Sequence, residues 1–328
     1  MKKSIAIVMG GYSSEHDISI TSGTVVYKFL DKEKYMPYRV LISREKWIAL
    51  DDNNQEYIIN KNDFSFNKGK SKIIFDCVFN AIHGAPGENG MLLSYFSLLN
   101  LPHTSANFYQ MALTFNKRDT LSVLKSYKIK TATSFYLNKG DVIDIKQIVE
   151  KVGLPCFVKP NNAGSSYGIS KAYTLEEVKI GIQTAYKEDD EILIESFLDG
   201  KEVSVGVIQY KGETKVLPIT EIVSENDFFD YEAKYLGKSE EITPARLTKE
   251  EREIIEKTAL KVYEILNMSG FSRSEYILVN GIPHFLEMNT VPGLTEESIL
   301  PKQAKEAGIS LADLFDNAIE GCFKKENY

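Results

Sequence analysis

The chain has 328 residues, of which 43% are hydrophobic and 26% charged, a composition typical of a globular protein with two or three domains. Its net charge of -7 argues against a nucleic-acid partner. The 3 scattered cysteines include no Cys-x-x-Cys pair and indicate neither a disulfide framework nor a zinc site. The first apolar run ends at Gly10-Gly11 and no apolar stretch approaches ~20 residues, so we expect no signal peptide, no membrane partner and a cytoplasmic location.

The beginning of the chain is predicted to form a parallel α/β domain. Continuous apolar runs at 5–9 and 75–82 indicate buried strands, and each is followed by glycines, where an α/β fold places its ligands. After the first run, Ser14 and Asp17 resemble a capping box that starts a helix, with Glu15 in the first turn. For Glu15, a favourable charge at a helix N-terminus is the alternative to a functional role. The glycines after the second run alternatively only permit tight backbone geometry.

The middle of the chain carries residues suited to a nucleotide. One helix is predicted over 110–127 and includes Lys117. A strand that ends at Lys159 leads into a Gly/Ser loop, where the lysine and backbone N–H groups can clamp phosphates; a flexible surface hairpin is the alternative. The strand 191–195 has an apolar edge flanked by acids such as Glu202, which can hold an adenine and a ribose, although ordinary strand patterning explains it too.

Residues 273–289 have the pattern of a β-hairpin around an Asn-Gly turn. If the loop has three residues, 280–282, facing positions sum to 562. Glu275 then lies opposite Glu287, and Arg273 lies opposite Asn289. A two-residue turn would change this parity, so the register is itself a prediction.

Two carboxylates directly opposed on a strand pair repel each other unless positive charge lies between them. Hard oxygen ligands of this kind suit Mg²⁺, which binds carboxylates together with substrate phosphates. The alternative is a solvated hairpin face with ordinary charges. The hairpin residues alone leave both interpretations open.

The order of these signals along the chain is more specific than any one of them. The positions concerned are Gly10, Gly11, Ser14–His16, His83, Gly84, Gly87, Glu88, Lys117, Lys159, Pro160, Gly164–Ser166, Glu195, Glu202, Phe229–Tyr235, Arg273, Glu287–Thr290, Pro292 and Gly293. With them the chain resembles, over essentially its whole length, the D-alanine–D-alanine ligases of the ATP-grasp superfamily. The resemblance implies an α/β fold of the ATP-grasp type, with an N-terminal parallel α/β domain and two α+β domains that sandwich ATP. We expect the domains at 1–105, 106–202 and 203–328.

The resemblance also implies an activity. Enzymes of this family use ATP to join two D-alanines through an acylphosphate and so supply the dipeptide for peptidoglycan. The expected cofactors are ATP and two Mg²⁺ ions, with Mn²⁺ as a substitute. The expected partners are D-alanine, ATP and a second copy of the chain in a homodimer.

The resemblance implies a role for each matching residue. Glu15, Ser165, Arg273, Tyr235, Lys234 and Gly293 are the expected catalytic residues, of which Arg273 and the Gly293 N–H would stabilise the oxyanion. The first D-alanine would lie near His83, and the carboxylate of the second would be held by Ser298 and Ile299. The nucleotide would be held by Lys117, Lys159, Ser166, Glu195, Leu198 and Glu202. The metal ligands would be Glu275, Glu287 and Asn289.

Three departures from the family pattern affect these expectations. Glu275 stands where an Asp is usual, so the metal or the strand must shift slightly. Asn89 replaces an acid in the glycine-rich turn, and Tyr167 adds bulk to the phosphate loop. The alternatives are a ligase that accepts D-lactate or D-serine second, another ATP-grasp ligase, and a catalytically silent binding module. The intact Lys234-Tyr235 pair argues against the first, and Arg273 argues against the last.

Overall fold

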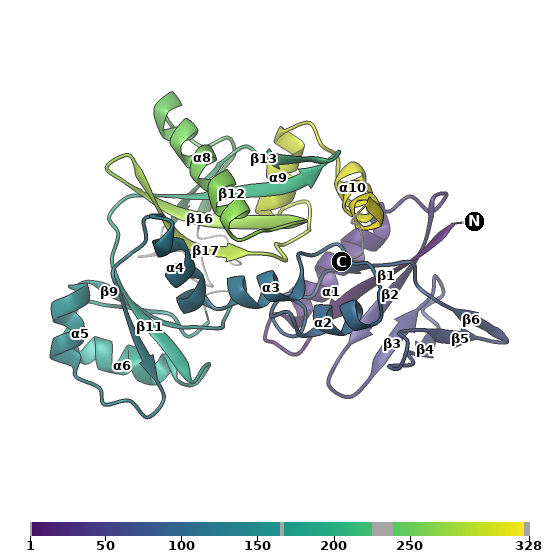
Figure 1. Cartoon of the computed structure of the whole chain (residues 1–328), viewed down its shortest axis with the longest axis horizontal. Coiled ribbons are helices and arrows are strands. Elements are labelled where there is room, and N and C mark those ends of the chain that lie inside the picture. The colour runs from purple at the N-terminus through teal and green to yellow at the C-terminus, as the bar shows by residue number, and fades with distance from the viewer. Residues whose placement is uncertain (1, 165–166, 225–238, 325–328) are drawn as a thin grey trace.

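The computed structural model describes residues 2–164, 167–224 and 239–324. Its elements form three bodies around a common centre (Figure 1). Each body is built on its own β-sheet, and the three sheets have five, four and six strands. Among the described residues, no helix combines the length and apolar character needed to cross a bilayer.

The N-terminal sheet is mostly buried and has the order β4-β3-β2-β1-β7. Strand β1 pairs in parallel with β2 and β7, and its burial is nearly continuous, as the unbroken apolar run predicted. The strands of this body are β1 (Lys3–Gly10), β2 (Tyr35–Ile42), β3 (Trp47–Leu50), β4 (Glu56–Ile58), β7 (Cys77–Asn80) and the separate hairpin β5 (Phe66–Lys68) and β6 (Ser71–Ile73). Its helices are α1 (His16–Phe29) and α2 (Met91–Leu98).

The predicted capping box at the start of α1 is wrong. Helix α1 begins at His16, Glu15 is its N-cap, and no side chain caps it. The stabilising hydroxyl belongs to Ser13, which accepts from the Glu15 N–H at 3.3 Å and donates to the His83 carbonyl at 3.1 Å. Glu15 is therefore fixed by a contact between the two glycine-rich turns of this sheet.

The second sheet has the order β10-β9-β11-β8, with antiparallel neighbours throughout. It comprises β8 (Ser134–Asn138), β9 (Cys156–Pro160), β10 (Ser170–Ala172) and β11 (Glu191–Ser196), together with helices α5 (Ile145–Val152) and α6 (Leu175–Ala185). The single helix predicted over 110–127 is two helices, α3 (Phe108–Phe115) and α4 (Lys117–Ser126). Asn116 has an extended backbone and its side chain accepts from the Asp119 N–H, so it ends one helix and caps the next.

The third sheet has the order β15-β14-β12-β16-β17, with β13 paired to β12. Its strands are β12 (Lys201–Tyr210), β13 (Glu213–Val216), β14 (Thr220–Ser224), β15 (Ser239–Ile242), β16 (Phe271–Val279) and β17 (Ile282–Asn289). The helices of this body are α8 (Lys249–Ile265), α9 (Ile299–Glu306) and α10 (Leu311–Lys324). Helix α8 starts with a complete capping box between Thr248 and Glu251.

The β16–β17 hairpin has the predicted pairing for a different reason. Asn280 and Gly281 alone form the turn, both with positive φ (49° and 77°), and Ile282 is already in β17 rather than in the loop. The parity is restored by a bulge at Leu286, because Tyr276 pairs with Phe285 while Glu275 pairs with Glu287. Thus Glu275 faces Glu287 and Arg273 faces Asn289, as expected.

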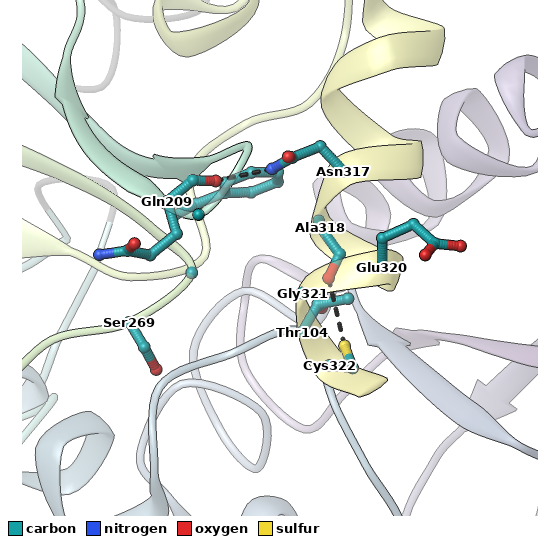
Figure 2. Close-up of a pocket in the computed structure, with 11 residues that line it drawn as sticks. Thr104, Gln209, Ser269, Asn317, Ala318, Glu320, Gly321 and Cys322 are labelled. Atoms are coloured by element: carbon teal, nitrogen blue, oxygen red, sulfur yellow. Dashed lines mark hydrogen bonds between the residues drawn. The ribbon is translucent and has the colours of Figure 1, made fainter. Parts of the chain in front are cut away.

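Helix α10 joins the last sheet to the first. Asn317 donates to the Gln209 carbonyl at 2.7 Å on one side, and Asp316 accepts from Lys34 and Tyr35, each at 2.7 Å, on the other. A cavity of about 270 Å³ lies beside the helix (Figure 2). None of the candidate site residues within the described ranges lines it. We therefore interpret this contact as structural.

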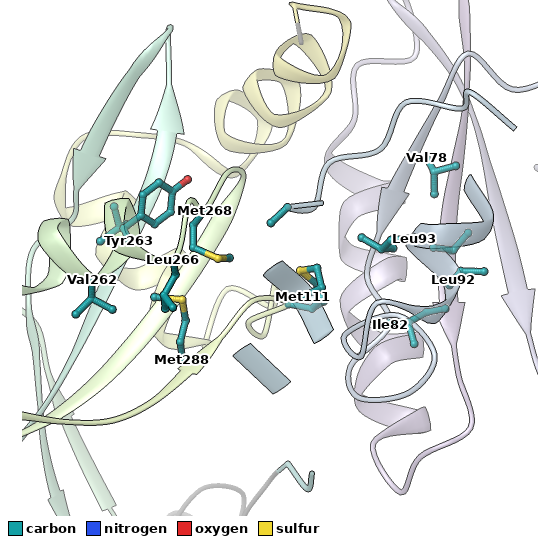
Figure 3. Close-up of a cluster of buried hydrophobic side chains, with 14 of the residues drawn as sticks. Val78, Ile82, Leu92, Leu93, Met111, Val262, Tyr263, Leu266, Met268 and Met288 are labelled. Carbon is teal, nitrogen blue, oxygen red and sulfur yellow. The ribbon is translucent and has the colours of Figure 1, made fainter. Parts of the chain in front are cut away.

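The largest hydrophobic cluster crosses from one body to another. Figure 3 shows it in part, from the N-terminal sheet and α2, through Met111 on α3, to α8 and β17. The labelled members are Val78, Ile82, Leu92, Leu93, Met111, Val262, Tyr263, Leu266, Met268 and Met288. Because its side chains are closely packed, this shared core holds the N-terminal turns in a fixed position relative to the β16–β17 hairpin.

Candidate active site

A cavity of about 290 Å³ lies where the N-terminal turns meet the last sheet. Its lining brings together seven of the predicted site residues from both ends of the chain: Glu15, His83, Arg273, Asn289, Gly293, Ser298 and Ile299. Such a concave site with converging polar groups is the usual place for a small substrate. The structure thus places these residues around one cavity, which the sequence order alone could not establish.

The β16–β17 hairpin supplies the carboxylates of the site. Arg273 forms an ion pair with Glu275 and donates to Ser204 Oγ on β12 at 3.0 Å. Burial alone would lower the pKa of Arg273, but the neighbouring Glu275 and Glu287 raise it above its usual value. Lys117 Nζ lies 3.3 Å from Glu287 Oε2. Each of the facing carboxylates therefore has its own cation, which offsets their repulsion.

The hairpin offers a partial set of oxygen ligands of the kind that suits Mg²⁺. Among the described residues, no group of three or more His, Cys, Asp and Glu could hold a metal ion. The hairpin offers two carboxylates and the amide of Asn289, whose buried Nδ2 has no hydrogen-bond partner among the described residues. Because the two ends of an amide are assigned from their partners, the rotated amide would present Oδ1 at this position. Mg²⁺ completes such a partial ligand set with phosphate oxygens and water.

Two lysines lie beside the expected nucleotide site. Lys117, the first residue of α4, donates to the Ala163 carbonyl at 2.7 Å. Lys159 is the penultimate residue of β9, and its Nζ lies 2.8 Å from Glu195 Oε2. Burial alone would lower the pKa of Lys159. The negative charges of Glu195, Glu287 and Glu202 outweigh this effect and raise the pKa, so the ammonium stays charged.

The other predicted nucleotide and substrate residues occupy identifiable positions. Leu198 is half-buried in the link between β11 and β12, and Glu202 lies on β12 opposite Ile277. Ser298 is the N-cap of α9, which begins with Ile299. A Cβ on Gly293 would lie 2.6 Å from Ser298 Oγ, so a larger residue here would force the Ser298 hydroxyl to move.

Four predicted residues are not placed. Ser165, Ser166, Lys234 and Tyr235 lie outside the described residues. The neighbouring Gly164 is placed, and a Cβ there would collide with the Glu15 carboxylate. The phosphate loop therefore approaches Glu15 at a glycine.

Glu88 has a structural role in the site that the sequence reasoning did not assign. Its Oε2 accepts from the Gly84 N–H at 3.1 Å, and its Oε1 accepts from the Thr290 N–H at 2.9 Å and the Val291 N–H at 3.3 Å. Glu88 thereby attaches the segment after the hairpin to the N-terminal turn. Its position one residue after Gly87 was visible in the sequence, but the partners 202 residues away were not.

We expect Glu88→Gln to change the pH dependence of stability. Burial raises the pKa of Glu88, and Glu15 adds to this effect. A raised carboxyl pKa contributes stability that is complete below the unfolded value of about 4.5 and is lost as pH rises through the folded pKa. The variant lacks this loss but leaves one backbone N–H without an acceptor, at a cost of roughly 1–3 kcal/mol. In urea unfolding, Glu88→Gln should therefore have a lower free energy of unfolding than the wild type, and this difference should narrow as pH rises.

Glu221→Gln is the matched control for this prediction. Glu221 is also buried but accepts from Arg246, which lowers its pKa. The stabilising contribution of Glu221 is present at neutral pH and lost on acidification. The difference in free energy of unfolding between wild type and Glu221→Gln should therefore widen as pH rises. Parallel stability curves for wild type and Glu88→Gln would contradict the assignment for Glu88.

The comparisons with known proteins agree with the fold. The family model for the D-Ala D-Ala ligase N-terminus matches residues 4–106, and the model for the C-terminus matches 119–320. The chain is 65% identical over 318 residues to a D-alanine–D-alanine ligase of Flavobacterium johnsoniae, covering 97% of this chain and 98% of the relative. It is 56% identical to one of Christiangramia forsetii, covering 99% and 100% of the two chains.

Solved structures of ligases share the architecture. A D-Ala:D-Ser ligase of Enterococcus faecalis superposes with a TM-score of 0.86 at 28% identity, covering 98% of this chain and 99% of its own. A D-alanine–D-alanine ligase of Bacillus anthracis, solved with ATP, superposes with a TM-score of 0.79 at 27% identity, covering 98% and 97%. The fold and site thus define an enzyme of the ligase class, with the expected α/β ATP-grasp architecture. The chain belongs to the D-alanine–D-alanine ligase family.

Proposed function

We propose that the protein joins two D-alanines to D-alanyl-D-alanine at the expense of ATP, for peptidoglycan synthesis. The observation that carries this proposal is the meeting of Glu15 and His83 with Arg273 and Asn289 around one cavity. A carboxylate is a poor acyl donor, so the γ-phosphoryl group is first transferred to the first D-alanine. The amine of the second D-alanine then attacks the acylphosphate carbonyl, and phosphate leaves.

The nucleotide end of the site consists of cations and acids. Lys117 and Lys159 would hold the phosphates. The adenosine would be held by Glu195, Leu198 and Glu202. Phosphoryl transfer depends mainly on positioning and on stabilising negative charge, which suits these two partly buried ammonium groups. Mg²⁺, or Mn²⁺ in its place, would be held by Glu275, Glu287 and Asn289 and would neutralise phosphate charge. Ser166 belongs to the same proposal but lies outside the described residues.

The substrate end would bind both amino acids. Glu15 would hold the ammonium of the first D-alanine near His83, and Ser298 with the Ile299 backbone would hold the carboxylate of the second. Arg273 and the Gly293 N–H would stabilise the oxyanion formed during attack. Ser165, Lys234 and Tyr235, which lie outside the described residues, complete the proposed set.

A D-Ala:D-Ser ligase is the second candidate, because such an enzyme has a closely similar fold. The relatives with 65% and 56% identity, by contrast, are D-alanine–D-alanine ligases, and we favour that specificity. Competition between D-alanine, D-serine and D-lactate as second substrate decides between them. A product that contains mainly D-serine would overturn our preference.

We expect phosphate release that requires D-alanine and ATP together and that stops when Mg²⁺ is removed with EDTA. Adding back Mg²⁺ or Mn²⁺ should restore it, because the hairpin provides oxygen ligands that suit either ion. Identification of D-alanyl-D-alanine by mass spectrometry completes the test. ATP binding without any turnover would instead support a binding module.

The wider setting is also part of the proposal. The family resemblance supports a homodimer in the cytoplasm and a division of the chain at 1–105, 106–202 and 203–328. The start of β12 at Lys201 favours moving the second boundary slightly towards the N-terminus. Light scattering of the purified protein tests the dimer.

A further inference from the structure

Ser22 connects two parts of the active site that come from different domains. It is fully buried on α1, in the N-terminal body. Its Oγ accepts from the Leu294 N–H at 3.3 Å and lies 3.0 Å from His83 Nε2. Leu294 is 272 residues further along the chain and directly follows Gly293. One small side chain thus contacts both the histidine of the cavity and the turn that carries the proposed oxyanion donor.

Only one tautomer of His83 allows Ser22 to donate to it. The Ser22 oxygen accepts from Leu294, and its own proton is available for a hydrogen bond to His83 Nε2. If the hydroxyl donates, Nε2 is unprotonated and a neutral ring carries its proton on Nδ1. A hydrogen bond with the Val291 backbone raises the pKa of His83, as a ring N–H that donates to a carbonyl would.

The charges around the ring agree with a neutral histidine. Burial lowers the pKa of His83, Glu88 acts in the opposite direction, and Arg273 lowers it further. Glu15, Glu241 and Glu297 line the same cavity. With a neutral ring, hydrogen bonds rather than charge determine how His83 is oriented.

We propose that Ser22 is a positioning residue of this active site, which fixes the Nδ1–H tautomer of His83 and the Gly293-Leu294 peptide at the same time. The proposal rests on the function proposed above. His83 and Leu294 lie on different domains, and the hydroxyl holds both at one point. Together with Glu88, which holds Thr290 and Val291, Ser22 anchors both ends of the 290–294 segment to the N-terminal body.

Ser19 provides a matched control. It lies on the same helix, is equally buried, and also makes two hydrogen bonds: it accepts from the Gly10 N–H at 2.8 Å and donates to the Ala81 carbonyl at 2.7 Å. Both of its partners are in the N-terminal body, and neither belongs to the proposed site. Ser19→Ala and Ser22→Ala should therefore lower the thermal unfolding temperature similarly, and only the second should affect positioning.

Steady-state kinetics with ATP, Mg²⁺ and D-alanine test the consequence. We expect Ser22→Ala to lower kcat/KM for D-alanine roughly 5- to 10-fold, with the KM for ATP unchanged, as loss of one positioning hydrogen bond implies. The acid limb of its pH–rate profile should move to higher pH, because the neutral ring loses a donor. Ser19→Ala should change neither, and Ser22→Thr, which keeps the hydroxyl, should recover most of the loss.

The tautomer can be observed independently of turnover. The chain has only 4 histidines, so ¹⁵N-histidine spectra compared with those of His83→Gln identify the His83 signals. We expect a protonated Nδ1 and an unprotonated Nε2 in the wild type, and a mixture of tautomers in Ser22→Ala. A protonated Nε2 in the wild type, or identical behaviour of Ser22→Ala and Ser19→Ala, would overturn the proposal. If the wild type released no phosphate with D-alanine, the proposed function would fail, while the spectra would still decide the role of Ser22.

Discussion

Replacing Glu287 with Gln is expected to reduce D-alanine-dependent phosphate release on the order of 10²- to 10³-fold, as loss of a charged group at a site of charge stabilisation does. The change keeps the shape of the side chain but removes the charge that faces Glu275 and that lies 3.3 Å from Lys117 Nζ. With one carboxylate fewer, the hairpin should also need a higher Mg²⁺ concentration for half-maximal activity. Phosphate release measured across a Mg²⁺ series gives both quantities.

Glu191→Gln is the control for this variant. Glu191 pairs with Arg118 at 2.9 Å, next to Lys117 in the chain, so the substitution breaks a comparable ion pair away from the hairpin. We expect nearly unchanged activity and Mg²⁺ requirement, because a partly exposed pair contributes little, about 1 kcal/mol or less. If both variants lost activity equally, the loss would come from general destabilisation, and the metal assignment for Glu287 would fail.

Replacing Arg273 with Lys is expected to lower kcat about 10²-fold or more while the protein stays folded. A lysine keeps the positive charge beside Glu275 but lacks the planar guanidinium, whose Nη1 donates to both Glu275 and Ser204 on β12. Because the oxyanion forms only during attack, the KM for D-alanine should change less than kcat. Dipeptide formation followed under saturating ATP measures this difference.

Arg246→Lys is the corresponding control on the same sheet. Arg246 donates through two nitrogens to Glu221, at 2.9 Å each, but its side chain is 61% exposed. This substitution also replaces a guanidinium that is paired with a glutamate, and it should leave kcat within about twofold, since exposed pairs contribute little. A large effect of Arg246→Lys, or a raised KM with unchanged kcat in Arg273→Lys, would argue against the oxyanion role.

The sequence by itself determined most of the local elements, and it predicted the site residues. A continuous apolar run predicted the buried strand β1, and the Asn-Gly pair predicted the hairpin that carries Glu275 and Glu287. These predictions succeed because burial and turn geometry depend on residues only a few positions apart. The ordered set of motifs then led to the family, which the two family models confirm. Even so, local pattern misplaced a cap at Ser14 and joined two helices across Asn116.

Only the tertiary structure decided how these residues meet. The bulge at Leu286 restores the register of the hairpin, and no local signal marks it, because it depends on how β17 packs in the sheet. The contacts of Glu88 with Thr290 and of Ser22 with Leu294 join positions 202 and 272 residues apart. A hydrogen bond between residues so far apart in the chain produces no pattern in the sequence, since it forms only after the shared core has brought the domains together.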